Sequence, residues 1–403
     1  MKNENILLSK KEKIGILQRR QKMEFDQKKG RETMELSMIA PCLFGLEGLV
    51  AEELRRLHMK TVEAENGRVL FSGTEADVAR ANINLRCAER VLLEMGQFSA
   101  ASFDALFEGV KALPWERYLP RNAAFPVKGY ALNSKLHSVP DCQKIIKKAI
   151  VERLKLKYAQ NWFSEDGPLY QVQFSLLKDW ATISIDTSGP GLHKRGWRAV
   201  GVAAPLRETL AAGMVMLSRY RGKGAFCDPF CGSGTIAIEA ALAACNRAPG
   251  LGRRFAAQAW PQLPAAVWAQ AKEEARDKEF HRDYDIWGGD LDPGAIAIAE
   301  SNARKAGVGD LIRFQQADAR QFAPRGSQGV VVTNPPYGER LLEKKEAAEL
   351  MAAFGKTYGA TEGFRLYLLS SDQKLEQHFG RKAGKKRKLY NGMIQCNLYF
   401  YEK

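Results

Sequence analysis

The sequence has no long hydrophobic run near its amino terminus and no cysteine pair with zinc-site spacing. The longest apolar run in the first 23 residues is three residues, whereas a membrane span needs about 20 and a signal peptide has an apolar core of at least about seven. The seven cysteines are odd in number and scattered, and the five histidines do not cluster. We therefore expect a cytoplasmic protein with reduced thiols, no membrane segment and no bound metal.

Only Cys227 and Cys231 lie close together, four residues apart. A structural zinc site needs a second pair of ligands at similar spacing, and the sequence offers none. We predict that both are buried small side chains.

Acidic residues are in deficit. Lys and Arg number 61 against 46 Asp and Glu, so the formal net charge is +15, which indicates a polyanionic partner and above all a nucleic acid. Hydrophobic residues make up 45% of the chain, enough for a folded core, and 403 residues favour two or three domains. Residues 1–37 are expected to be a charged extension, because residues 1–33 carry ten basic and five acidic side chains. This segment is either a solvated lead-in or an arm that touches RNA.

Residues 38–190 read as an α+β region with two parts. An N-terminal subdomain at 38–100 combines strands expected at 38–42, 68–71 and 91–98 with helices at 46–57 and 75–87. The part at 101–190 has a helix from Ser138 to about Tyr158, opened by a capping-box variant at Ser138-Val-Pro-Asp141, and strands at 170–177 and 181–186.

The helix expected at 138–158 carries basic side chains on its polar positions. Among them Lys144, Lys147 and Lys148 are candidates for RNA contact. A basic helix face is also compatible with a merely solvated surface. The excess positive charge of the whole chain favours RNA contact.

From residue 191 to 403 the pattern alternates between short apolar runs and helices, which is typical of a doubly wound parallel sheet. We expect a helix at 206–220 and strands at 225–228, 286–290, 312–314, 330–333 and 365–370. Residues 388–390 and 394–401 flank Asn391-Gly392, so the sheet should finish with an antiparallel hairpin. Arg247–Asp283 is an apparent insertion, either near the substrate or packed on the surface by its tryptophans.

The segment Asp228-Pro-Phe-Cys-Gly-Ser-Gly-Thr235 follows the first of these strands and opens a helix. Gly232 and Gly234 let the backbone approach a ligand, and the helix amino terminus offers free N–H groups. A tight strand-to-helix turn alone explains such glycines equally well. Carboxylates then end the next two strands: Asp290 and Asp292 in Gly288-Gly-Asp-Leu-Asp-Pro293, and Asp318 after the third. A carboxylate at a second strand's end is where a ribose is usually bound.

The fourth strand runs into Asn334-Pro-Pro-Tyr337. Two prolines fix the backbone and end the strand, which places the Asn334 amide and the Tyr337 ring rigidly at the edge of a cleft.

In this order, the four motifs resemble class I S-adenosylmethionine-dependent methyltransferases of the NPPY type, which modify exocyclic amines. Four further segments are similar to the bacterial 23S rRNA guanine-N2 methyltransferase family, whose members carry a THUMP RNA-binding domain; they are Leu192-His-Lys-Arg-Gly-Trp-Arg198, Ala204-Pro-Leu-Arg-Glu-Thr-Leu-Ala-Ala212, Asn246-Arg-Ala-Pro-Gly250 and Asn334-Pro-Pro-Tyr-Gly-Glu-Arg-Leu341. The resemblance covers about residue 38 onwards. It implies a THUMP domain at 101–190 and a Rossmann-like methyltransferase domain at 191–403.

The resemblance also implies the site residues. Asn334, Pro335 and Tyr337 would orient the target base, and Lys194, Arg195 and Arg198 would join the lysines of 138–158 in binding RNA. The cofactor S-adenosylmethionine would be bound by Asp228, Phe230, Gly232, Gly234, Thr235, Asp290, Asp292, Asp318 and Asn334.

Three alternatives to a 23S rRNA guanine-N2 methyltransferase stay open. A tRNA guanine-N2 methyltransferase would share the THUMP domain and the NPPY loop. An adenine-N6 methyltransferase also uses NPPY. An RNA-binding ribosome assembly factor with a silent methyltransferase domain belongs to a different functional class, and the intact motifs argue against it. The sequence leaves the oligomeric state and the modified position undetermined.

Overall fold

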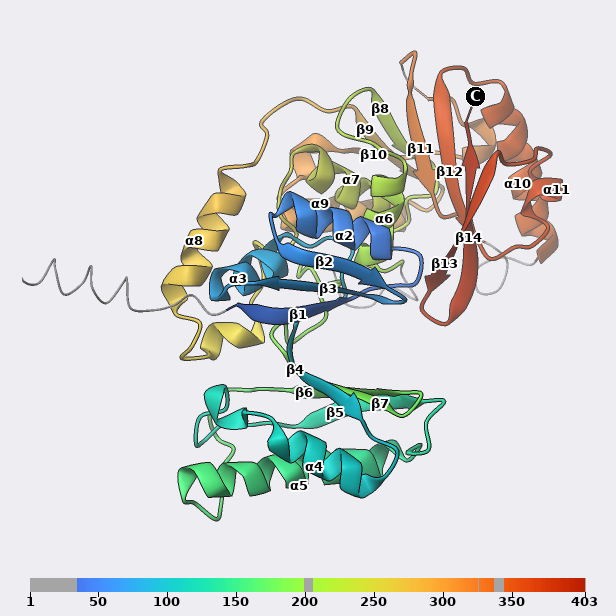
Figure 1. Ribbon diagram of the computed structural model, residues 1–403. Coiled ribbons are helices and arrows are strands. Elements are labelled where there is room, and N and C mark those ends of the chain that lie inside the picture. The colour runs from blue at the N-terminus through green and yellow to red at the C-terminus, as the bar shows by residue number, and fades with distance from the viewer. Residues whose placement is uncertain (1–34, 199–205, 325, 337–343, 403) are drawn as a thin grey trace, which may run out of the picture.

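Two seven-stranded sheets organise the chain in the computed structural model, which describes residues 35–198, 206–324, 326–336 and 344–402. The extension expected at 1–37 lies almost wholly outside these residues. The first sheet belongs to the N-terminal region and the second to the C-terminal half (Figure 1). All seven cysteines are free and buried, as predicted for Cys227 and Cys231.

The first sheet joins two sub-assemblies through one strand. Its order is β2-β3-β1-β4-β7-β6-β5, with β1 at Leu36–Pro41, β2 at Lys60–Glu65, β3 at Arg68–Gly73, β4 at Leu92–Ser99, β5 at Val127–Leu132, β6 at Val172–Leu177 and β7 at Trp180–Asp186. Only Met38 and Ile39 of β1 pair with β4, whereas β4 pairs along its whole length with β7. Strand β4 therefore connects the two sub-assemblies.

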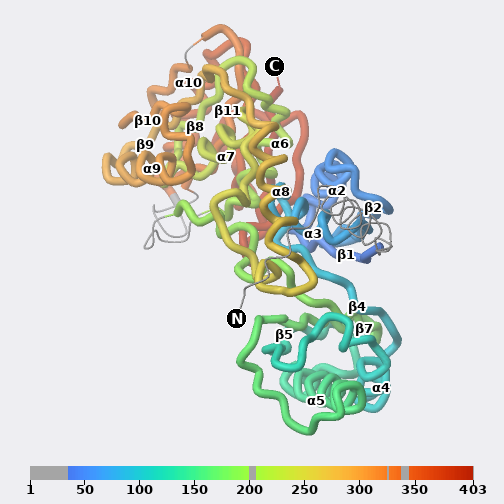
Figure 2. Tube along the Cα trace, turned by 90° about the vertical axis from the view of Figure 1, so that its left-hand side faces the viewer, coloured from blue at the N-terminus to red at the C-terminus, as the bar shows by residue number. Residues whose placement is uncertain are grey.

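Helices cover each sub-assembly separately. In the first they are α2 (Glu47–Arg56) and α3 (Glu75–Asn84); in the second they are α4 (Phe103–Ala112) and α5 (Val139–Tyr158). The second forms a lobe that stands apart from the rest of the molecule in two perpendicular views (Figures 1 and 2). Its α5 begins at the predicted place, but Ser138 Oγ donates to Asp141 Oδ2 at 2.6 Å instead of accepting a backbone N–H.

The second sheet has five parallel strands followed by an antiparallel pair, in the order β10-β9-β8-β11-β12-β14-β13. The bounds are β8 Ala225–Asp228, β9 Ile286–Asp290, β10 Arg313–Gln316, β11 Gly329–Thr333, β12 Phe364–Ser370, β13 Lys385–Asn391 and β14 Ile394–Tyr401. The side chains of Val330 and Val332 enter one buried cluster and that of Val331 another, because both faces of the sheet are covered. The predicted doubly wound fold with a terminal hairpin is confirmed.

Helices alternate with these strands. They are α6 (Glu208–Leu217), α7 (Thr235–Ala244), α8 (Ala265–Arg276), α9 (Pro293–Ala306), α10 (Lys344–Gly359) and α11 (Leu375–His378). The terminal hairpin turns one residue later than Asn391-Gly392 suggests, since Asn391 still pairs with Ile394. Gly392 adopts φ 65°, so the glycine supplies the left-handed conformation at the first turn position.

The apparent insertion connects all parts of the molecule. Trp260 stacks on Tyr170 of the lobe at 4.4 Å between ring centroids and donates from Nε1 to the Leu169 carbonyl at 2.9 Å. Helix α8 contacts α3, where Arg80 and Glu274 form an ion pair with two hydrogen bonds. The insertion therefore packs against the N-terminal region, and its tryptophans are core residues.

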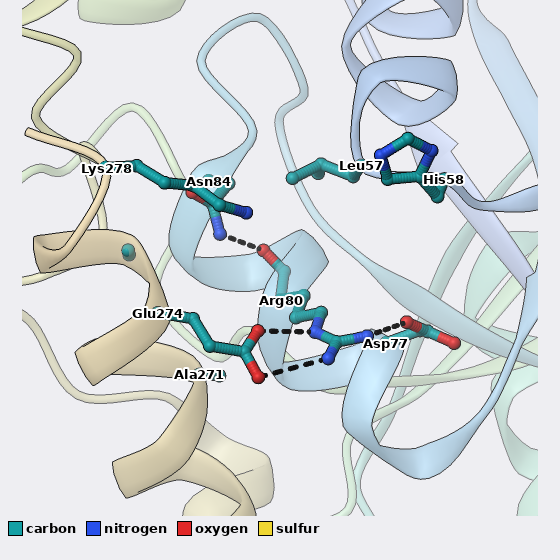
Figure 3. A pocket seen from close by; sticks show the side chains of 9 residues that line it. Leu57, His58, Asp77, Arg80, Asn84, Ala271, Glu274 and Lys278 are labelled. Carbon is teal, nitrogen blue, oxygen red and sulfur yellow. Dashed lines mark hydrogen bonds and ion pairs between the residues drawn. The ribbon is translucent and has the colours of Figure 1, made fainter.

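A cavity of about 270 Å³ lies between α3 and α8 (Figure 3). Arg80 crosses it between Glu274 and Asp77, and Asn84 donates to the Arg80 carbonyl. These groups satisfy one another, and none of the predicted site residues lines the cavity.

A buried arginine joins the N-terminal region to the second sheet's domain. The side chain of Arg195 is 2% exposed; it donates to Glu239 Oε1 of α7 at 3.1 Å, to the Leu192 carbonyl at 2.8 Å and to the Arg86 carbonyl at 2.5 Å. The prediction that Arg195 binds RNA is wrong, because a guanidinium enclosed in this way cannot reach a phosphate.

Replacing Arg195 should therefore destabilise the protein. Arg195→Ala leaves the Glu239 carboxylate buried without its partner, which typically costs about 3 to 5 kcal/mol. Chemical denaturation monitored by tryptophan fluorescence measures the loss. The neighbouring Lys194 is exposed, so Lys194→Ala is the matched control and should change stability by less than about 0.5 kcal/mol. Equal stabilities of the two variants would contradict the structural role of Arg195.

Candidate active site

Predicted site residues converge at the carboxyl ends of β8, β9 and β11. Asp228 ends β8, Asp290 ends β9 and Thr333 ends β11. Neighbouring parallel strands end at the same edge of a sheet, so residues 105 positions apart meet: Thr333 Oγ1 donates to Asp228 Oδ1 at 2.7 Å. The same carboxylate oxygen accepts from Phe230 N at 3.3 Å. We call residues 228–235 the glycine loop. The hydrogen bond fixes the start of this loop against Thr333, the residue before Asn334.

The glycine loop is open at one glycine and packed at the other. Gly232 adopts φ 51°, and a Cβ there would meet nothing within 4 Å. Gly234 adopts φ 82°, and a Cβ would come within 2.9 Å of Ala299 and 3.0 Å of Phe314. The first glycine is therefore suited to close approach by a ligand, while the second is required by packing against α9 and β10.

The three strand-end carboxylates have different surroundings. Asp290 Oδ2 accepts from Gly232 N at 2.9 Å and Oδ1 from Asp292 N at 3.0 Å. Asp292 is exposed and caps α9 by accepting from Gly294 N at 2.8 Å. Asp318 pairs with Arg320 at 2.7 Å, and the guanidinium lowers the pKa of that carboxyl. Among the three, Asp290 is the one whose backbone contacts tie it directly to the glycine loop.

Two buried acceptors at this edge have no partner among the described residues: Asp228 Oδ2 and Asn334 Oδ1. Burial raises the pKa of Asp228 to about 7. Buried polar atoms are nearly always satisfied by protein, water or a ligand, and these two lie where the glycine loop and the Asn-Pro-Pro turn meet. Together with the empty space at Gly232, they fit a polar ligand held between the glycine loop and the Asn-Pro-Pro turn.

Arg198 lies next to the glycine loop. Its Nε donates to Glu208 Oε1 at 2.8 Å, and its two terminal nitrogens reach Ser233 Oγ at 3.3 Å and Thr235 Oγ1 at 3.1 Å. Arg198 therefore supports the glycine loop, and its direct contact with RNA stays a prediction. Sequence reasoning missed Glu208, although it stands within the quoted segment 204–212.

The other predicted site residues differ in how far they are exposed to solvent. Phe230 packs edge-on against Phe354 at 5.2 Å, and Pro335 is buried, whereas Lys194 is exposed. Tyr337 lies outside the described residues. No helix in the described ranges is long and apolar enough to cross a membrane.

The three lysines predicted on α5 are not equivalent. The side chain of Lys144 is 79% exposed, and Lys148 is exposed as well. Lys147 instead pairs with Glu165 at 2.6 Å and lies over the Phe125 ring at 3.5 Å. Lys144 also pairs with Asp141, at 3.5 Å, but this pair is mostly exposed. Lys144 and Lys148 therefore remain accessible to a phosphate, while Lys147 has a structural role.

Three family models match successive parts of the chain. Residues 195–399 match the family described as RMKL-like, methyltransferase domain, residues 37–92 match the RlmL ferredoxin-like domain, and residues 100–186 match the THUMP domain. The chain belongs to the family of THUMP-containing RMKL-like methyltransferases.

Relatives cover most of the chain. A Bacillus subtilis (strain 168) protein named "Putative RNA methyltransferase YpsC" is 44% identical over 91% of this chain and 95% of its own length. A Syntrophotalea carbinolica protein named "Ribosomal RNA large subunit methyltransferase K/L" is 36% identical over 89% of this chain but only 52% of its own length. The chain thus spans about half of this second, larger relative.

Solved structures share the fold. A protein from Listeria monocytogenes described as "a predicted N6-adenine-specific DNA methylase" is 46% identical, with a TM-score of 0.87 over 92% of this chain and 96% of its own. A protein described as "SMU.472, a putative methyltransferase complexed with SAH" is 40% identical, with a TM-score of 0.86 over 91% of this chain and 98% of its own.

Asp290 and Asp292 allow a matched test of the cofactor site. Asp290→Ala removes a carboxylate that holds the glycine loop, and it should weaken S-adenosylmethionine binding by about 1 to 3 kcal/mol. Asp292→Ala removes a helix cap and should cost about 1 kcal/mol of stability with little change in cofactor affinity. Titration calorimetry for binding and thermal unfolding for stability separate the two effects. An unchanged dissociation constant of the Asp290→Ala variant for S-adenosylmethionine would rule out Asp290 as a cofactor-binding residue.

Proposed function

We propose that this chain is an S-adenosylmethionine-dependent methyltransferase that modifies the exocyclic N2 of a guanine in 23S ribosomal RNA. The observation that carries the proposal is the buried Asn334 Oδ1 directly after β11, which has no hydrogen-bond partner among the described residues. The Thr333–Asp228 hydrogen bond fixes it beside the glycine loop. An acceptor held in this position suits a ligand amine.

The same edge of the sheet is suited to hold the cofactor. Asp290 would accept hydrogen bonds from the ribose of the cofactor. The free space at Gly232 would let the cofactor approach the backbone of the glycine loop. Phe230 and Asp318 lie at the same strand ends. A relative of the same fold is described as complexed with SAH, the product that S-adenosylmethionine leaves after methyl transfer. When bound, the cofactor supplies a methyl group on a sulfonium, which departs as a neutral thioether.

The chain's own task is to orient the amine. The N2 lone pair of guanine is delocalised into the ring, so both N–H groups need fixed acceptors while the nitrogen is aimed at the methyl carbon. Asn334 Oδ1 and the Pro335 carbonyl would accept those two N–H groups, and Tyr337 would stack on a base flipped out of the RNA. The prolines keep this geometry rigid.

RNA as the substrate rests on the N-terminal region. We assign residues 1–37 to an extension, 38–100 to an α+β subdomain, 101–190 to the THUMP domain that binds RNA and 191–403 to catalysis. Exposed Lys144 and Lys148 on α5, together with Lys194, would contact phosphates. The K/L name of the half-matched relative supports ribosomal RNA over tRNA.

A second candidate is methylation of adenine N6, which the name of the Listeria relative favours. The NPPY geometry suits either exocyclic amine. Incubation of the purified protein with unmodified 23S rRNA, tRNA and DNA, followed by nucleoside mass spectrometry, separates the candidates. The proposed function requires N2-methylguanosine from 23S rRNA; N6-methyladenosine, or product from tRNA or DNA alone, would contradict it.

Asn334→Ala distinguishes a catalytic role from a structural one. Loss of the positioned acceptor should lower single-turnover methylation by about 10²-fold or more, while folding and cofactor affinity stay near normal. Tyr337→Ala should weaken productive RNA binding by about 1 to 3 kcal/mol, and Tyr337→Phe should be mild. A normal single-turnover rate for Asn334→Ala, measured with saturating cofactor, would overturn the mechanism.

A further inference from the structure

A strongly basic strand forms one edge of the methyltransferase sheet. Residues 381–388 contain six basic and no acidic side chains, and we call them the basic edge segment. Its last four residues, 385–388, form the first part of β13, the outermost strand of the sheet. Five of the six cations are exposed, namely Arg381, Lys382, Lys385, Lys386 and Lys388.

Most cations of the basic edge segment are not neutralised by a carboxylate in the described part of the chain. Lys386 forms an ion pair with Glu376, whose other carboxylate oxygen accepts from Ala383 N at 2.8 Å. Arg387 donates to the Gly45 carbonyl at 2.6 Å and so attaches the strand to the N-terminal region. Lys388 lies over the Tyr390 ring at 5.4 Å, an arrangement that leaves its ammonium group in solvent.

Strand register places this segment at the catalytic edge. Lys386 pairs with Tyr399, Tyr399 with Leu368 and Leu368 with Thr333, the residue before Asn334. Three steps between neighbouring strands at about 4.8 Å each put Lys386 about 14 Å from Thr333 along the sheet. The chain then runs onward past the carboxyl ends of the parallel strands.

Lys388 and the hairpin turn therefore project on the side where the Asn-Pro-Pro loop lies. Lys388 pairs with Asn397, which pairs with Ser370 at the carboxyl end of β12. Beside it, Phe44 is 56% exposed and contacts Tyr390 edge-on at 6.1 Å. Cations and aromatic rings in one strip are what single-stranded nucleic acid requires of a surface.

Lysines on an edge strand also have a simpler purpose, which is to prevent pairing with another chain's strand. Here five exposed cations extend over eight residues, on both faces of the strand, since Lys385 lies over Phe400 and Lys386 over Tyr399. Their mutual repulsion is unfavourable unless a polyanion neutralises it.

We propose that the basic edge segment binds the phosphates of the substrate RNA next to the target nucleotide. This inference rests on the proposed function, since it takes RNA as the substrate. The THUMP lobe then holds another part of the same RNA, and the hairpin fixes the part that enters the active site.

The test uses the full chain and a charge-matched control. The variant Lys382→Gln/Lys385→Gln/Lys388→Gln removes three exposed cations and keeps the Lys386–Glu376 pair. The control Lys223→Gln/Lys305→Gln/Lys356→Gln removes three exposed cations that precede β8 or end α9 and α10, on the opposite side of the sheet. Binding of a 23S rRNA transcript is measured over a range of KCl concentrations.

The edge variant should bind the transcript at least about tenfold more weakly than the control, and its slope of log affinity against log salt should be smaller by about 2 to 3. Cofactor affinity should be unchanged in both proteins. Equal affinities and slopes for the two variants would overturn the proposal, and self-association of the edge variant with unaltered RNA binding would show that the lysines guard the edge. The RNA-binding assay does not depend on methylation. If mass spectrometry found a methylated base other than N2-methylguanosine, that would contradict the proposed function and leave the binding result unaffected.

Discussion

The hydrogen bond from Thr333 to Asp228 is the contact on which the site depends. It joins the ends of two adjacent parallel strands, one leading into the glycine loop and the other into Asn-Pro-Pro. Since Asp228 is completely buried, the carboxylate is poorly solvated and its pKa rises to about 7. The bond and the Phe230 N–H partly offset that cost, and the second carboxylate oxygen stays unpartnered among the described residues.

Two arginines near this contact, Arg198 and Arg195, form further networks of polar interactions. Arg198 links Glu208 to Ser233 and Thr235, while Arg195 links Glu239 to the N-terminal region. The Arg195 guanidinium is enclosed by these acceptors and is 2% exposed. Arg198 thereby supports the shape of the glycine loop, and Arg195 attaches the N-terminal subdomain to α7.

Positive charge is consequently distributed by role. Arginines with planar, many-donor side chains occupy the buried junctions, where several carbonyl and carboxylate acceptors surround them. Exposed lysines dominate α5 and β13, where a flexible ammonium can meet phosphates in many geometries. The net charge of +15 therefore does not measure how many cations can contact RNA.

Some elements were predictable because local composition decides them. The strands at 225–228 and 286–290 agree with β8 and β9, since each begins with apolar residues and ends at an aspartate. Strand β2, by contrast, has mainly exposed residues at an edge of its sheet, and no apolar pattern reveals it. The helix expected to reach Cys87 ends at Asn84 because Leu85 is extended.

The sequence by itself determined the order of the motifs, the parallel sheet and the side of that sheet where the site must lie, since these follow from hydrophobic runs and from the residues that directly follow them. Only the tertiary structure decided which cations face solvent. Lys194 and Arg195 are neighbours in one basic segment, yet the first is exposed and the second is buried against Glu239. That difference arises because Glu239, 44 residues away, faces the junction from α7, and no local pattern contains this information.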